Sequence, residues 1–238
     1  MADVPRELSD LLSTALFESV AVIDPDQLTD DERDAVPDWW LEATQLPLQA
    51  GIARAIDQWQ TTLPGTLVNL HERLRESGRG IFLGRSESGG KPLLAYVSAV
   101  PSGEIVCWYG FPPSPALENP SLDLTKFPTS TRVFYTQLHD GFTLASAFHN
   151  GFPASAELFA VGEDLTTDSA EVQGTKPAPN LDELVSLFFD FGASSVCVEL
   201  DDDSVDRRDG WVVSDAQVQP VDDIWMTIDQ WMRSLAQP

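Results

Sequence analysis

Two histidines in closely similar surroundings are the residues most suggestive of chemistry. Residues 138–142 read LHDGF, and ten positions later residues 148–152 read FHNGF. Two such corners in succession could bring His139 and His149 to one cleft, as an acid–base pair or as metal ligands. Asp-Gly and Asn-Gly are also typical of turns, in which the phenylalanines fill the core and the histidines bond to nearby backbone. The sequence favours the turn interpretation and leaves the paired histidines as the catalytic alternative.

A run of carboxylates near the C-terminus is the second candidate. Six acids fall within residues 199–209, namely Glu199, Asp201, Asp202, Asp203, Asp206 and Asp209. Calcium prefers oxygen ligands, but the spaced DxDxDG register and the distal glutamate of a calcium loop are missing, and Arg207 and Arg208 partly neutralise the run. A solvated turn and an acidic patch for a basic partner both remain open, and a metal site is the least favoured of the three.

The overall charge restricts the partners that such residues could serve. The chain has 238 residues with 38 acidic and 14 basic side chains, which gives a formal net charge of −24. This field repels phosphate, so nucleic acid and anionic membranes are disfavoured and a cationic partner is the natural complement. A hydrophobic content of 42% with seven tryptophans is enough for a folded core. We expect a cytoplasmic protein, because no long apolar stretch and no signal-peptide pattern occur.

Motifs that carry common enzymatic chemistry are missing from the sequence. It contains no phosphate-binding loop, dinucleotide-binding glycine fingerprint, nucleophile elbow or zinc-ligand spacing. We therefore expect a protein that is not an enzyme and that holds no metal or other cofactor. Cys107 and Cys197 lie in apolar, strand-like segments, which predicts two buried free thiols rather than a disulfide.

The tryptophans divide into two groups. Three lie on apolar helical stripes and are expected in or near the core, namely Trp59, Trp225 and Trp231. The pairs Trp39–Trp40 and Trp108–Tyr109 are sequence neighbours, and neighbours on a strand face opposite ways. One member of each pair is therefore a candidate for an exposed functional surface, and burial of both in the core is the alternative.

Hydrophobic periodicity predicts helices, then strands, then a helix, strands and a final helix. The expected elements are an amphipathic helix over 5–22, an acidic loop or short helix with a solvated face over 24–40, two helices over 46–77 divided at Pro64-Gly65, three antiparallel strands over 80–111, a helix over 131–139 that buries Val133, Phe134, Gln137 and Leu138, strands at 157–161, 184–192, 195–203 and 210–215, and a helix after Asp222 or Asp223. Strands in runs favour an α+β fold with a mainly antiparallel sheet flanked by helices.

The domain organisation follows from the same elements. Residues 112–127 contain four prolines and no clear period. They are a linker or an ordered excursion between a segment 1–111, with helices and a three-stranded meander, and an α+β part over 128–238. The two parts can also form one continuous domain.

From about Phe127 onward the chain resembles the SUKH superfamily, which is widespread among bacterial immunity proteins that neutralise polymorphic toxins. Phe127-Pro128 followed by TRVFYTQLHDGF resembles the family's Leu-Pro start of a helix that ends in an Asn-Gly-type corner. FFDFGASSVCVELDDD resembles its aromatic-Gly strand and the following "LD" strand, GWVVSD its next strand, and DDIWMTIDQWMRSL its terminal helix. About 110 of the 238 residues are covered. His139-Asp140-Gly141 replaces the usual Gly-Gly corner, and residues 1–126 have no assigned counterpart.

The resemblance implies an immunity protein that binds and blocks a cognate toxin domain with a basic surface, as a monomer or weak dimer. We expect the interface to combine the acidic segment, the corner at 139–142 and exposed aromatic side chains, that is Tyr135, His139, Asp140, Glu199, Asp201, Asp202, Asp203, Asp206 and Trp211. One alternative is a small hydrolase or nucleotide-handling enzyme that uses His139 and His149. Another is an adaptor or chaperone-like protein whose Trp-rich N-terminal half binds a partner.

Overall fold

A computed structural model describes residues 4–16, 19–86, 90–115, 119, 121–145, 150–163, 165, 171–174, 176–190, 194–200 and 208–235. Within these residues the chain forms seven α-helices and one eleven-stranded sheet. The helices are α1 (Val4–Leu16), α2 (Asp30–Ala35), α3 (Asp38–Gln45), α4 (Leu48–Thr62), α5 (Val68–Ser77), α6 (Thr129–Val133) and α7 (Ile224–Leu235). The strands are β1 (Val20–Ile23), β2 (Gly78–Ser86), β3 (Pro92–Ala99), β4 (Ile105–Phe111), β5 (Asp140–Leu144), β6 (Gly151–Phe152), β7 (Glu171–Val172), β8 (Leu184–Asp190), β9 (Ser194–Glu199), β10 (Gly210–Ser214) and β11 (Gln217–Val221).

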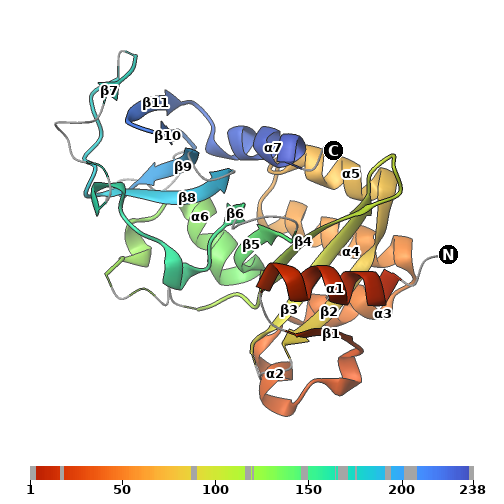
Figure 1. Cartoon of the computed structure of the whole chain (residues 1–238). Coiled ribbons are helices and arrows are strands. Elements are labelled where there is room, and N and C mark those ends of the chain that lie inside the picture. Colours follow the sequence, from red (N-terminus) through yellow and green to blue (C-terminus); the bar gives the residue numbers. More distant parts are fainter. Residues whose placement is uncertain are drawn as a thin grey trace.

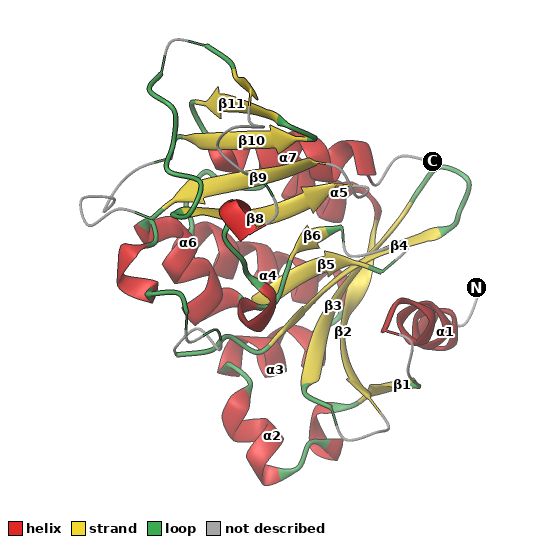
Figure 2. Cartoon of the chain, turned by 60° about the vertical axis from the view of Figure 1, so that its left-hand side comes forward, coloured by secondary structure: helices red, strands yellow, loops and turns green. Residues whose placement is uncertain are grey.

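The sheet is open and mostly antiparallel, as the grouping of strands predicts. Its order is β1-β2-β3-β4-β5-β6-β8-β9-β10-β11-β7, and the β11–β7 pair is parallel. Helices α3 to α7 cover one face and bury the main hydrophobic core, whereas α1 lies across the other face of the N-terminal strands (Figures 1 and 2). The expected α+β class is confirmed.

The first predicted helix is too long. It ends at Leu16, and Val20–Ile23 instead forms the edge strand β1 beside β2. The Val-Ala-Val-Ile sequence suits an extended chain because β-branched side chains pack well on a pleated surface. The Ser13 and Ser9 hydroxyls of α1 accept hydrogen bonds from the Val20 and Val22 amides, at 2.8 and 3.2 Å, so the helix also covers donors of this edge.

The sheet continues across the proline-rich segment 112–127. Strand β4, before this segment, pairs with β5, after it, in a register that sets Trp108 opposite Leu144 and Tyr109 opposite Thr143. The main core likewise combines residues from both sides, from Ile23 to Met232. The sheet and the main core therefore include described residues from both sides of this segment.

A π-helical turn changes the buried face of the helix after Pro128. Helix α6 runs over Thr129–Val133 and passes into a π-helix over Phe134–Leu138, where the His139 amide donates to the Phe134 carbonyl at 3.0 Å. The wider turn rotates the following side chains relative to a regular α-helix. Gln137 is therefore exposed and Tyr135 is buried, which corrects the predicted face.

The C-terminal third contains the predicted meander with three differences, of which the first is the short strand β7 (Glu171–Val172), which was not predicted. The segment 157–161 is no strand and makes only the isolated bridge Ala160–Val185 beside short 3-10 turns. Strand β11 was not predicted, because its Pro220 interrupts the strand pattern. Helix α7 begins as expected, since the Asp223 carboxylate accepts the Met226 amide at 3.0 Å.

Candidate functional site

His139 lies inside the main core as one end of a hydrogen-bonded chain. The Trp59 indole N–H donates to the Tyr96 hydroxyl at 3.0 Å, and that hydroxyl lies 2.7 Å from His139 Nε2. Because an indole nitrogen can only donate, the Tyr96 hydroxyl is free to give its own proton to Nε2. The neutral imidazole then carries its proton on Nδ1, the nitrogen that faces Gly110 of β4.

The position of His139 does not suit acid–base catalysis. The side chain is completely buried, and burial lowers its pKa to about 3, although the Phe111 backbone carbonyl opposes this shift. The ring is therefore neutral near pH 7 and closed off from a substrate. His149 lies outside the described residues.

The repeated corners are paired strands. Phe142 of β5 lies directly opposite Phe152 of β6, and both side chains are fully buried. Gly141 and Gly151 have φ angles of 84° and 135°, which side chains with a Cβ rarely adopt. The predicted core positions of the two phenylalanines are confirmed, whereas the predicted turns are wrong for the described residues, because Asp140-Gly141 and Gly151 lie in strands.

Four of the expected interface residues are buried and were wrongly placed at the surface, namely Tyr135, His139, Asp140 and Trp211. The π-turn directs Tyr135 inward, where its hydroxyl donates to the Pro153 carbonyl at 3.0 Å. The Asp140 carboxylate accepts the Ser155 amide at 2.7 Å and so fixes the β5 corner. Trp211 packs in a small cluster with Val161 and Leu181, because the chain between β6 and β8 covers that face.

The predicted acidic segment is only partly visible. Glu199 is half-buried and accepts the Asn180 amide at 3.3 Å, whereas Asp201, Asp202, Asp203 and Asp206 lie outside the described residues. Nearby, Asp209 pairs with Lys176 and Asp223 with Arg208, at 3.1 and 3.0 Å. Cations therefore offset part of the charge at this end of the molecule.

A different acidic surface emerges at the opposite end of the chain. Residues 24–38, here called the acidic lobe, carry seven acidic residues and one arginine. The lobe includes α2, which projects beyond the end of the sheet (Figure 1). Six of its carboxylates are exposed and form no ion pair within the described part of the chain, namely Asp24, Asp26, Asp30, Asp31, Asp34 and Asp38.

The acidic lobe is held in place by contacts of its own. The Thr29 hydroxyl accepts the Glu32 amide at 3.2 Å while the Glu32 carboxylate accepts the Thr29 amide at 2.8 Å, a reciprocal cap of α2. Arg85 of β2 reaches the same carboxylate at 3.1 Å, and Leu28 and Val36 are buried in the main core. The sequence indicated the charge of this segment, but not its projection from the fold.

The remaining chemistry-bearing residues are core residues. Cys107 and Cys197 are free and buried as predicted, and burial raises the pKa of the Cys197 thiol to about 11. No cluster of three or more possible metal ligands occurs among the described residues. The expected core positions of the single tryptophans are confirmed: Trp59 and Trp225 are buried, and Trp231 packs partly buried against the core.

Neither aromatic pair has an exposed member, so the alternative of an exposed functional aromatic in these pairs is wrong. Trp108 packs in the main core while Tyr109 packs in the cluster beneath α1, so the two sides of β4 are both covered. Trp39 and Trp40 lie on a helix rather than a strand, and both belong to the main core. Neighbouring aromatics can both be buried because helices cover both faces of the N-terminal strands.

Comparison with known proteins identifies no relative: no protein-family model, no curated protein and no solved structure matches this chain. In the described residues, none of the helices combines the length and the apolar character needed to cross a membrane. The surface charges and contacts of the chain itself are therefore what support a function.

Proposed function

We propose that this chain is a cytoplasmic immunity protein of the SUKH type, which binds a cognate toxin domain with a basic surface and blocks it. The observation that carries the proposal is the net charge of −24 together with the six exposed aspartates of the acidic lobe, which no described cation pairs. A negative surface of this kind attracts a cationic partner over long range and repels wrong partners of like charge. The sequence resemblance over residues 127–238 supports the same function.

The proposed interface differs from the one expected from the sequence. The acidic lobe takes the main role, because its carboxylates are exposed and the segment is anchored by Leu28, Val36 and Arg85. The segment with Asp201, Asp202, Asp203 and Asp206 stays a second acidic candidate. The buried residues Tyr135, His139, Asp140 and Trp211 support the fold instead of contacting the partner.

The two alternatives have less support in the described structure. The enzyme hypothesis depends on His139, whose ring is buried and neutral. The adaptor hypothesis depends on exposed tryptophans in the N-terminal half, yet Trp39, Trp40 and Trp59 are all buried. Deleting residues 1–110 would also remove β1 to β4 from the common sheet, so that truncation would disrupt the fold rather than isolate a partner-binding half.

The test is co-expression with the product of the gene immediately upstream, since an immunity gene normally lies directly downstream of its toxin. We expect rescue of growth and a stable complex. The lobe variant Asp30→Asn/Asp31→Asn/Asp34→Asn should slow association by about tenfold at low salt, because the steering charges lie at the interface. Surface plasmon resonance at several salt concentrations measures this rate.

A matched control removes the same charge elsewhere. Asp10, Asp57 and Asp182 are exposed and lie outside the lobe, so their triple Asn variant should slow association much less. Asp201→Asn/Asp202→Asn/Asp203→Asn tests the second segment. Equal slowing by all three variants would reject the lobe as the interface. Absence of both complex and rescue would contradict the immunity function itself.

A further inference from the structure

A cleft lies at the edge of the sheet where β1 ends. It has a volume of about 440 Å³, which is within the range of ligand-binding pockets. Its walls come from the start of α1, the end of β1, the junction of α3 and α4, and the first half of β2. Most of the side chains that line it are apolar, and the charged ones are Asp24 and Arg79. An apolar group of a partner is therefore the natural occupant.

Two leucines on one wall of the cleft are exposed to solvent. Leu46 and Leu48, at the junction of α3 and α4, are 43% and 45% exposed. The other exposed large apolar side chains of the described residues do not line this cleft, namely Val68, Val172 and Met226. Exposed apolar side chains that gather in a cleft are typical of a binding site, whereas single ones need no explanation.

The cleft also contains a backbone edge of β2. Two hydroxyls of α1 accept the Val20 and Val22 amides, so these N–H groups point away from β2. Backbone direction alternates along a strand, so Ile23 points towards β2, where it lies opposite Leu83. By the same alternation along β2, the N–H and C=O of Ile81 point to the same side as those of Leu83. That side is the one on which β1 lies.

Strand β1 stops before it reaches Ile81, as the short arrow beside the longer β2 shows (Figure 2). In a continued β1 the residue opposite Ile81 would be Pro25, which has no N–H and begins a 3-10 turn. Among the described strands, β3 pairs with Ile81 through Tyr96 on one side, and none pairs with it on the other. An edge of this kind is a template for an added strand.

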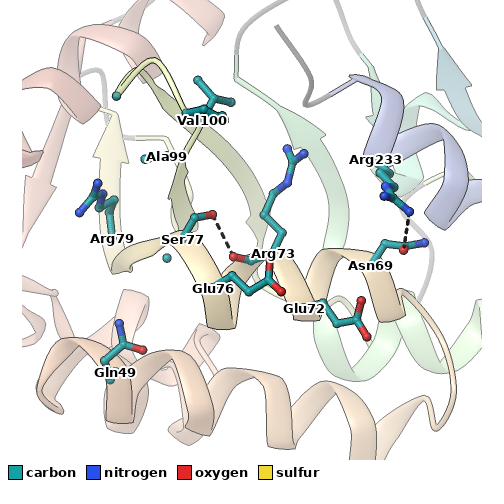
Figure 3. Close-up of a pocket in the computed structure, with 13 residues that line it drawn as sticks. Gln49, Asn69, Glu72, Arg73, Glu76, Ser77, Arg79, Ala99, Val100 and Arg233 are labelled. Carbon is teal, nitrogen blue, oxygen red and sulfur yellow. Dashed lines mark hydrogen bonds between the residues drawn. The ribbon is translucent and has the colours of Figure 1, made fainter.

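The two charged residues of the cleft give an added strand its direction. The register places Asp24, which belongs to the acidic lobe, next to Phe82 and three residues from Arg79. In Figure 3, which draws the neighbouring cleft on the α5 side, Arg79 stands apart from Arg73 and Arg233. A strand that continues β1 runs antiparallel to β2, so its first residues lie beside Asp24 and its last beside Arg79. Its complement is a basic start and an acidic end.

We propose that this cleft receives an extended segment of the partner toxin, which adds a strand to β2, packs apolar side chains against Leu46 and Leu48 and sets a basic residue beside Asp24. The proposal rests on the immunity function proposed above and names the part of the partner that the cleft holds. In such strand addition, main-chain hydrogen bonds give affinity and side-chain contacts give specificity. The neighbouring acidic lobe attracts the basic surface that carries the segment.

Titration of the isotope-labelled full chain with the peptide acetyl-KKVTVE-amide tests the proposal by NMR. The lysines match Asp24, the glutamate matches Arg79, and the two valines face one side of an extended strand. The Ile81 amide signal should shift and its hydrogen exchange should slow, because this N–H gains a partner. The same peptide with N-methylated valines keeps its charges but loses two backbone donors, so it should not bind.

Variants of the cleft test the side-chain contacts. Leu46→Ser/Leu48→Ser should weaken peptide binding by about tenfold or more, because apolar contact is lost, and both positions are exposed, so the fold should be kept. The matched control is Val68→Ser/Met226→Ser, which removes two comparably exposed apolar side chains outside the cleft and should leave binding unchanged. Asp24→Asn should weaken binding at low salt and have less effect at high salt.

The outcomes separate the cleft from the immunity function. An unshifted Ile81 amide signal, equal binding of the N-methylated peptide, or equal weakening by the control variant would overturn the strand-binding cleft. Self-association of the free chain that Leu46→Ser/Leu48→Ser abolishes would assign the cleft to a second copy instead. Peptide binding without a complex with the upstream gene product would reject the toxin as the source of the segment. A complex with rescue but without peptide binding would reject the cleft and leave the immunity function standing.

Discussion

At the residue scale, the hydrogen-bonded chain of Trp59, Tyr96 and His139 is the main polar feature of the core. All three side chains are buried, and aromatic rings surround the imidazole, with Phe142 stacked on it and Trp40 tilted against it. A buried polar group is costly unless it is hydrogen-bonded. These two hydrogen bonds give partners to Trp59 Nε1, the Tyr96 hydroxyl and His139 Nε2, which would otherwise lie unpaired in the aromatic core. His139 thus acts as an acceptor that orders the core.

Tyr96→Phe measures how much the hydrogen bonds between Trp59, Tyr96 and His139 contribute to stability. The change leaves Trp59 Nε1 and His139 Nε2 without their partner, and we expect a loss of about 2 kcal/mol in the free energy of unfolding. Urea denaturation measures it. In a His139→Phe background, Tyr96→Phe should lower the free energy of unfolding clearly less, because His139 Nε2, one of the two atoms that lose their partner, is already absent. Additive costs would show that the two side chains do not depend on each other.

At the element scale, a carboxylate of one helix closes the start of another. Asp229 of α7 accepts the backbone N–H groups of Asn69 and Leu70 at 2.9 and 3.2 Å, in the first turn of α5. These donors have no partner within their own helix, and a negative charge at a helix start is favourable. Burial raises the pKa of Asp229, and the hydrogen bonds from the α5 backbone partly oppose this. The contact joins segments 160 residues apart.

Asp229→Ala should therefore be more harmful than loss of an ordinary cap. We expect about 3 kcal/mol of destabilisation, since the buried N–H of Leu70 and the half-buried N–H of Asn69 lose a charged acceptor. Asp223→Ala is the control, because Asp223 caps its own helix at a half-buried position and should cost only about 1 kcal/mol. Thermal and urea unfolding of both variants compare them. A larger loss of stability in Asp223→Ala than in Asp229→Ala would show that the hydrogen bonds from α5 to Asp229 contribute little to stability.

At the scale of the whole molecule, a single sheet with covered faces buries two neutral histidines. Burial lowers the pKa of His71 to about 4 and that of His139 to about 3. In the unfolded chain both groups titrate near pH 6.5. As the pH falls below 6.5, the unfolded state takes up protons that the folded state does not accept, so stability present at neutral pH is lost.

His71→Leu should reduce this sensitivity to acid. Neither ring nitrogen of His71 has a partner in the described part of the chain, so we expect little change in stability at pH 7. Between pH 7 and pH 5 the variant should lose about 2 kcal/mol less than the natural chain, because one titrating group has been removed. Urea unfolding at both pH values measures the difference. Parallel losses in the two proteins would show that His71 is protonated in the folded state.

Much of the fold could be predicted because its local patterns are strong. The apolar stripe of α4 and the interruption at Pro64-Gly65 define helices that need no distant partner to be recognised. The turn residues between β2, β3 and β4 likewise indicate hairpins. Where a local pattern is ambiguous, tertiary contacts decided the structure. Val20–Ile23 forms a strand because β2 offers it an edge to pair with. The π-turn after α6 buries Tyr135 and leaves Gln137 exposed, where the helical spacing predicts Gln137 on the buried face.

The sequence by itself determined the composition of the molecule: its charge of −24, its buried thiols and the acidic character of residues 24–38. Only the tertiary structure decided which of these residues are exposed. Tyr135 and Trp211 are buried because other segments cover them, whereas α2 is exposed between Leu28 and Val36, which are buried in the core. Asn69 and Asp229 meet because α5 packs against α7, and residues 160 positions apart in sequence carry no local signal of their contact.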